Sequence, residues 1–325
     1  MTGEPIDVVL KTTPQLEWRP TISEAAVPGR EAPRLKIQSL EYEISFVLST
    51  LAYTYTLLSR SSLHILYSST SSSPSPEQRT QAIQAASKNL FSAASVHEYL
   101  STRADQVPTE SPFVDISRSS FRALTYLARA EATLLAVLKD DPYPAIVAQD
   151  RNQNDNEWMI KAPDIPKVRA HLFARLCLAA GEHASNAHAL LNAGAKGQRV
   201  NVELLRYVED LKRVGRGKAC RFFGIDAELG GKTGDALAWL QAANYELGYV
   251  KKEEGKKGFG FGKLKKDWKE NREEKKIIKG SNWGGDAGKA EEGRVIELLE
   301  KKWTKMNDTV SRAIVPRSFI RADDL

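Results

Sequence analysis

The sequence of 325 residues has little of what marks secreted, membrane-spanning or disulfide-rich proteins. Its two cysteines, Cys177 and Cys220, both lie in apolar helical patterns, which favours buried thiols in a reducing compartment over a disulfide. The longest uncharged run, residues 44–59, is shorter than the roughly 20 residues of a membrane-spanning helix. Glu4 and Asp7 stand where a signal peptide needs a basic start. We therefore expect a cytoplasmic protein that reaches a membrane only through a partner.

Motifs for catalysis and cofactor binding are also missing. The residues 231–233 (GKT) look like the end of a P-loop, but Asp226 stands where its first glycine is required. The glycines of residues 258–262 lack the spacing of a dinucleotide fingerprint. His183 and His188 are five residues apart and so lie on different sides of a helix, which leaves no metal-ligand set. We predict a protein that is not an enzyme and binds neither a metal nor another cofactor.

The sequence also lacks the short alternating runs that build a β-sheet. Apolar residues instead recur every three or four positions, the period of one helix face. The expected helices span about 40–58, 77–102, 115–138, 163–191, 200–223, 233–249 and 291–310, with a short one opening at Pro144. Pairs of such helices predict an all-α fold, a curved helical solenoid. Strict tetratricopeptide signatures are absent, so the repeat is irregular.

Composition divides the chain into three parts. Residues 1–33 form a proline-rich N-terminal arm, which we expect to be extended because proline forbids a long helix. Residues 34–316 form the helical domain, with a basic, glycine-rich insert at 251–290. Residues 317–325 form a short C-terminal tail.

The positive charge is concentrated in the insert. Residues 251–280 contain twelve Lys or Arg against six Asp or Glu, which equals the net charge of +6 of the whole chain. Lys263, Lys265, Lys266 and Trp268 are candidates for contact with anionic lipid or RNA, because basic side chains attract phosphates and aromatic rings insert or stack. A solvated loop is the alternative.

Three stretches resemble the BRO-domain family. Residues 222–248 are similar to the helical hairpin near the end of these domains, with Gly234-Asp235 as its turn. Residues 307–310 (NDTV) together with Val315-Pro316 resemble the family's Asn-Asp-x-Ile and Val-Pro pair at the same separation. Residues 128–131 (ARAE) are similar to its Ala-Gln-Ala-Gln-Glu run.

The resemblance covers roughly residues 35–316 and implies a non-enzymatic adaptor. BRO domains of this kind are tetratricopeptide-like, curved and helical, and dock the amphipathic C-terminal helix of the ESCRT-III core subunit. The segments 51–63, 140–152 and 256–270 look like a fungal branch of the family that acts in ambient-pH signalling. This likeness implies partners from that pathway and recruitment to endosomal or cortical plasma-membrane sites.

The family's partner-binding patch maps onto Leu134 and Ile146, with Val147 beside them. A helix break between the first two lets them converge from adjacent helices. A further leucine of the patch falls near Asp150, which does not match. Leu240 is a fourth candidate. The alternative is that these are ordinary core residues.

Two classes of function therefore stay open. If the chain is a protein-binding scaffold, its binding should persist at high salt. If it is an electrostatic lipid- or RNA-binding module, its binding should be lost at high salt.

Overall fold

The structure is a computed structural model that describes residues 11–25, 32–67, 74–106, 111–150, 167–193, 199–249 and 283–308. Eight α-helices and one short 3₁₀ helix account for most of these residues. They are α1 (Leu40–Tyr67), α2 (Pro76–Gln106), η1 (Val114–Ile116), α3 (Arg118–Asp140), α4 (Tyr143–Asp150), α6 (Lys167–Ala193), α7 (Val202–Leu229), α8 (Thr233–Glu246) and α10 (Lys289–Met306). The predicted all-α fold is confirmed.

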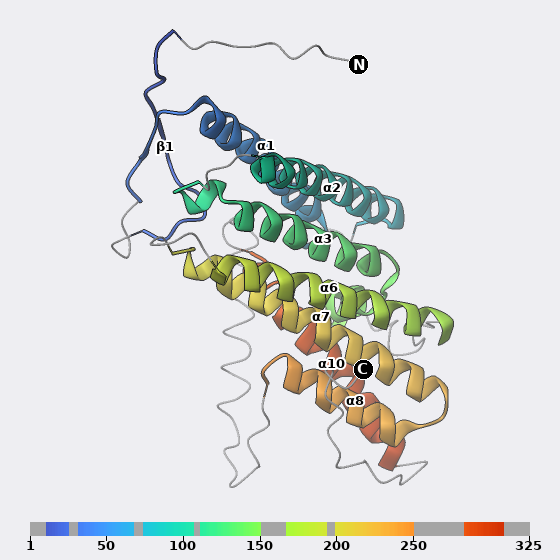
Figure 1. Ribbon diagram of the computed structural model, residues 1–325. Coiled ribbons are helices and arrows are strands. Elements are labelled where there is room, and N and C mark those ends of the chain that lie inside the picture. The colour runs from blue at the N-terminus through green and yellow to red at the C-terminus, as the bar shows by residue number, and fades with distance from the viewer. Residues whose placement is uncertain are drawn as a thin grey trace, which may run out of the picture.

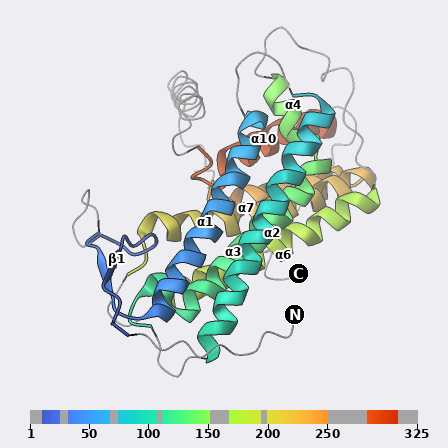
Figure 2. The ribbon, with the colours of Figure 1, turned by 90° about the horizontal axis from the view of Figure 1, so that it is seen from above.

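The long helices are stacked in chain order, as a solenoid requires. Helix α1 packs on α2, α2 on α3, α3 on α6, α6 on α7, and α7 on α8 (Figure 1). Helix α10 breaks this order, because it returns across the stack to contact α8, α4 and α7. Figure 2, seen from above, places α10 beside α4. Helix α10, residues 289–306, therefore covers α4, residues 143–150, from the middle of the chain.

Local chemistry explains where several helices begin and end. The side chain of Ser117 accepts a hydrogen bond from the backbone N–H of Ser120 and caps α3, and Asn201 caps α7 in the same way. Helix α3 ends at Asp140, two residues before Pro142, whose ring cannot continue a helix. The break expected between Leu134 and Ile146 is therefore present.

The turn between α7 and α8 lies earlier than the sequence suggested. Gly231 takes the left-handed conformation, with φ of 74°, that a side chain disfavours. Gly234-Asp235, the expected turn, instead lies in the first turn of α8, so that assignment was wrong. The GKT motif at residues 231–233 therefore closes one helix and opens the next, with no strand before it.

Two short strands were missed. Strand β1 (Leu16–Trp18) pairs antiparallel with β2 (Leu35–Ile37), and Ser23 forms an isolated bridge with Val200. Three-residue strands are too short to show an alternating pattern, so the expectation of no sheet was wrong here. The pairing joins residues on both sides of position 33, so the described part of the arm packs against the helical domain.

Small residues bring the central helices close together. A Cβ on Gly215 of α7 would lie 2.9 Å from the backbone nitrogen of Gly181 of α6, so α7 accepts no larger residue at this position without moving. Buried alanines continue this face along α6, at Ala174, Ala180, Ala184 and Ala187. The result is a closely packed α6–α7 pair at the centre of the stack.

Candidate functional site

The four residues of the predicted partner-binding patch meet at one hydrophobic cluster. Ile146 and Val147 of α4 and Leu240 of α8 are members of this cluster, and Leu134 of α3 packs against it. Ile146 is 8% exposed and Leu240 is fully buried, whereas Leu134 is half-buried. The structure therefore brings the four together, but it does not show the exposed position that we expected for Ile146.

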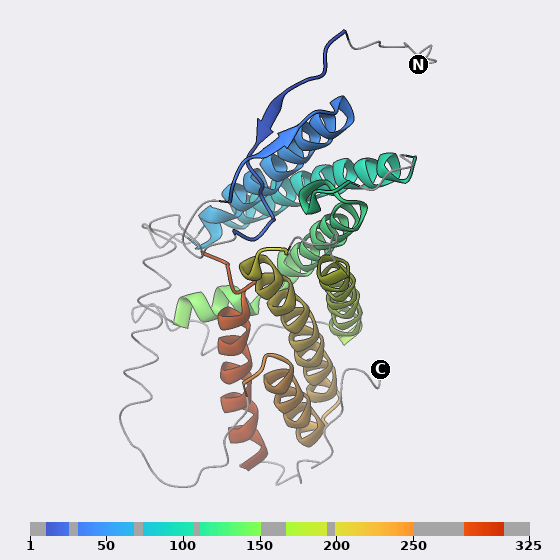
Figure 3. The ribbon, with the colours of Figure 1, turned by 60° about the vertical axis from the view of Figure 1, so that its left-hand side comes forward.

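Helix α10 is the reason for this burial. It lies against α4 and supplies Val295, Ile296 and Leu299 to the cluster that holds Ile146 and Val147 (Figure 3). Burying a side chain of this size stabilises the fold by roughly 1.5–3 kcal/mol. Helical periodicity alone could not show that a segment about 150 residues later would cover α4.

A buried ion network locks the same junction. The guanidinium of Arg221 on α7 lies 2.6 Å from Asp141, at the end of α3, and 2.5 Å from Glu292 on α10. The ammonium of Lys218 lies 2.6 Å from the other oxygen of Glu292. Desolvation favours the neutral form of Glu292, but the charges of Arg221 and Lys218 outweigh it and lower the pKa of this carboxyl. Two carboxylates and two cations thus tie three helices together.

Aromatic rings complete the surroundings of Arg221. Its guanidinium carbon lies 4.3 Å from the ring centre of Phe222 and 5.6 Å from that of Tyr143, the first residue of α4. Arg221 stands between Cys220 and Phe222, both buried, and a charge inside such a stripe is the only sequence signal that could have revealed the network. The role of this residue was missed.

The ARAE motif also has a structural role. The hydroxyl of Tyr207 on α7 donates a hydrogen bond to the carboxyl of Glu131 on α3, at 2.5 Å. Desolvation raises the pKa of Glu131 to about 7, although the hydrogen bond from Tyr207 acts in the opposite direction. This contact joins two helices that are not neighbours in the stack.

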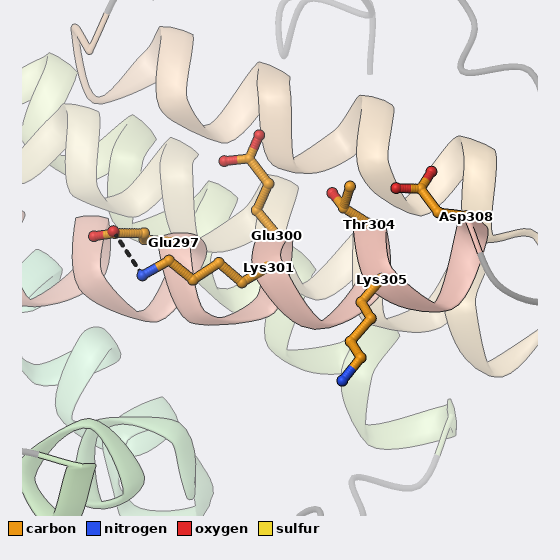
Figure 4. A pocket seen from close by; sticks show the side chains of 6 residues that line it. All are labelled: Glu297, Glu300, Lys301, Thr304, Lys305 and Asp308. Carbon is orange, nitrogen blue, oxygen red and sulfur yellow. Dashed lines mark ion pairs between the residues drawn. The ribbon is translucent and has the colours of Figure 1, made fainter. Parts of the chain in front are cut away.

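One surface hollow follows α10. Its lining comes from a single stretch of chain: Glu297, Glu300, Lys301, Thr304, Lys305 and Asp308 (Figure 4). Both charge signs are present, and Lys301 pairs with Glu297 at 3.0 Å. No second element among the described residues supplies a group opposite these side chains, and the hollow has no nucleophile–base pair.

Potential metal ligands, cysteines and apolar helices can be located in the described ranges. No group of three or more His, Cys, Asp or Glu there is arranged to hold a metal ion. Both cysteines are buried, and burial raises the pKa of each thiol to about 12, which keeps them unreactive. Within the same ranges, no helix is long and apolar enough to cross a membrane. Lys263, Lys265, Lys266 and Trp268 lie outside the described residues.

Comparison with known proteins shows what the sequence and the fold of this chain resemble. No family model matches the chain. The chain is 42% identical over 337 residues to the pH-response regulator protein palC of Emericella nidulans. This alignment covers 97% of the chain and 66% of palC. The chain thus spans slightly less than two thirds of this relative.

Solved structures agree on the fold. The chain is similar to one described as the ALIX BRO1 CHMP4C complex, with a TM-score of 0.57, 16% identity, and coverage of 96% of this chain and 67% of that one. A second, described as the structural basis for endosomal targeting by the Bro1 domain, gives a TM-score of 0.52, 18% identity, and coverage of 93% and 64%. The chain is therefore related to the palC protein along almost its whole length and has the fold of a Bro1 domain.

Proposed function

We propose that this chain is a non-enzymatic adaptor that binds the amphipathic C-terminal helix of an ESCRT-III core subunit in ambient-pH signalling. The observation that carries the proposal is the relationship to palC, a protein named as a pH-response regulator, along 97% of the chain. The fold supports it, because one structural neighbour is a BRO1 domain described in complex with CHMP4C. Recruitment to endosomal or cortical membranes would follow from that partner.

The docking surface that we propose is the C-terminal half of α3. Leu134 and Leu138 lie one helical turn apart, both are half-buried, and both pack against core clusters from the edge. An amphipathic helix places apolar anchors with this spacing against such a surface. Ile146, Val147 and Leu240 would support Leu134 from beneath, as members of the cluster on which it rests.

Binding of a labelled peptide, measured by fluorescence anisotropy, tests the proposal. The peptide carries the C-terminal amphipathic helix of the ESCRT-III core subunit. The parent chain should bind it saturably, and Leu134→Asp should weaken binding about 30-fold, which corresponds to the roughly 2 kcal/mol of a dominant contact. Leu57→Asp is the matched control, because Leu57 is 61% exposed on α1, away from α3.

Thermal unfolding of the same samples separates a lost contact from a lost fold. If Leu134→Asp keeps both its melting temperature and its affinity, the surface on α3 is wrong. If the parent chain does not bind the peptide, the adaptor proposal itself fails.

The second candidate is an anionic-surface module formed by residues 251–280. Its support is the excess of six positive charges in this segment, with Trp268 among the lysines. Reversing Lys263, Lys265 and Lys266 to Glu should then abolish binding to anionic liposomes and leave peptide binding unchanged. A parent chain that ignores liposomes rejects this candidate.

A further inference from the structure

A second cleft is lined by residues of β1, the loop after it, α1 and η1. Figure 1 shows β1 beside the start of α1, away from α10. The volume of the cleft is about 420 Å³, enough for a small ligand or one long side chain. One wall is aromatic: the rings of Trp18 and Phe46 stack with centres 5.4 Å apart and planes 10° apart. Asp115, from η1, adds a carboxyl group to the lining.

Asp115 is a buried carboxylate that has only neutral partners. It is 2% exposed. One oxygen accepts hydrogen bonds from the backbone N–H groups of Thr21 and Ile22, at 2.6 and 2.9 Å, and the other accepts one from the hydroxyl of Ser23. No ion pair within the described part of the chain includes it, and Arg19, which also lines the cleft, has an interaction of its own. Buried carboxylates usually have a cationic partner.

Polar atoms without partners gather at the same place. The described residues contain three buried side-chain polar atoms that make no hydrogen bond: Ser49 Oγ, Tyr53 Oη and His97 Nδ1. Ser49 and Tyr53 lie one turn apart on α1 and both line the cleft, and the ring of His97 lies 5.7 Å from that of Tyr53. Ser49 and His97 are each 2% exposed. An unsatisfied buried polar atom costs about 1–3 kcal/mol, so the two that line the cleft, with a third on the ring next to Tyr53, indicate a missing partner.

A partner that suits these groups carries a positive charge and donates hydrogen bonds. Burial lowers the pKa of His97 to about 4, so this ring is neutral. Burial, with a smaller effect of the Asp115 charge, raises the pKa of Tyr53, so its phenol is neutral as well. The one formal charge among Ser49, Tyr53, His97 and Asp115 is therefore the carboxylate.

We propose that this cleft binds a primary alkylammonium group, with its N–H bonds directed at Asp115, Ser49 and Tyr53 and its alkyl chain along Trp18 and Phe46. An ammonium has three donors, matching the two hydroxyl oxygens and the remaining acceptor capacity of the carboxylate. The aromatic wall favours an organic cation over a metal ion, because rings attract alkylammonium groups but ligate no hard cation. A lysine side chain, a peptide amino terminus and a free amine share this chemistry.

Titration calorimetry of the whole chain with n-butylammonium chloride tests the site, with n-butanol as the neutral probe of similar shape. We expect saturable binding of the amine in the millimolar range or tighter and no binding of the alcohol. Nα-acetyl-lysine amide and glycyl-leucine amide then distinguish the sources, since the first offers only a side-chain ammonium and the second only an amino terminus. Equal binding of amine and alcohol would mean that the cleft does not select a cation, and no binding of any amine would mean that it holds only water. Either result would overturn the proposal.

Two variants keep the test independent of folding. Ser49→Ala and Tyr53→Phe each remove a hydroxyl that has no partner, so neither should lower the melting temperature. Each should weaken amine binding by about tenfold, the usual effect of one hydrogen bond to a charged group. Unchanged affinity in both variants would contradict the assignment. It does not depend on the proposed adaptor function, and failure of peptide binding would leave it intact.

Discussion

Two carboxylates, Glu292 and Asp115, are almost fully buried near opposite ends of α3, and their surroundings differ: Asp115 lies just before this helix, and Glu292 shares Arg221 with Asp141 at its end. Glu292 faces Arg221 and Lys218, each at hydrogen-bonding distance. Within the part of the chain that the structure describes, Asp115 receives hydrogen bonds from neutral donors only, and it lines the same cleft as the unsatisfied hydroxyls of Ser49 and Tyr53. Glu292 is part of an ion network, whereas no ion pair in the described ranges includes Asp115.

The difference separates a structural lock from an open site. A buried ion pair is weak evidence for stability in itself, but removing one partner leaves an uncompensated charge. The α7 junction is therefore sensitive to mutation and needs no ligand. At the cleft near β1, the hydroxyls of Ser49 and Tyr53 are already unpaired. Removing either one should therefore change the stability of the fold little but weaken the binding of an alkylammonium group.

The largest effect is expected for Arg221→Met. This change leaves Asp141 and Glu292 buried without their shared cation and should lower the free energy of unfolding by about 3–5 kcal/mol. Urea denaturation followed by circular dichroism measures the loss. A change below about 1 kcal/mol would show that the network does not lock α10 to the stack.

Ile146→Ala should follow, with a loss of about 2–4 kcal/mol, because it leaves a cavity between α4 and α10. The control Leu57→Ala removes an exposed leucine and should change stability by less than about 0.5 kcal/mol. Similar small values for both variants would mean that α10 does not cover Ile146 in solution.

His97, next to the cleft near β1, should make the stability of the chain depend on pH. The pKa of His97 is about 4 in the folded chain and higher when unfolded, so the unfolded chain binds more protons between these values. The contribution of His97 to stability should fall as pH decreases from about 6.5 to 4, by up to about 3 kcal/mol at roughly 1.4 kcal/mol per pKa unit. His97→Leu should remove this contribution and leave stability at pH 8 nearly unchanged. Glu131, whose pKa is raised to about 7, contributes in the opposite direction in both the parent and the variant, so the difference between their slopes reports His97. An identical slope in parent and variant would place the proton uptake elsewhere.

The smallest effect is expected for a surface pair. Arg103 binds Glu41 through two contacts of 2.5 and 2.6 Å, but both side chains are about one third exposed. Arg103→Met should therefore cost less than about 1 kcal/mol. A loss as large as that of Arg221→Met would remove the distinction between buried and surface charges.

Periodicity and proline positions predicted the helices well. The break before α4 and the starts of α2 and α8 fall within a few residues of their expected places, because these signals are local. The burial of Ile146 under α10, the β1–β2 pairing and the partners of Arg221 depend on contacts between residues far apart in the sequence. Helical spacing shows that a residue is apolar on one face, but not which later segment will cover that face.

The central claim is that an apolar surface of this fold docks an amphipathic helix. The most direct test of this claim is the salt dependence of peptide binding. Anisotropy titrations of the parent chain with the ESCRT-III peptide should be run at about 0.1 and 1 M salt, where the screening length falls from about 10 to 3 Å. The adaptor account predicts saturable binding whose affinity changes less than about threefold and which survives reversal of Lys263, Lys265 and Lys266 to Glu. Binding that disappears at high salt or in the reversed variant would contradict it and assign recognition to the basic segment.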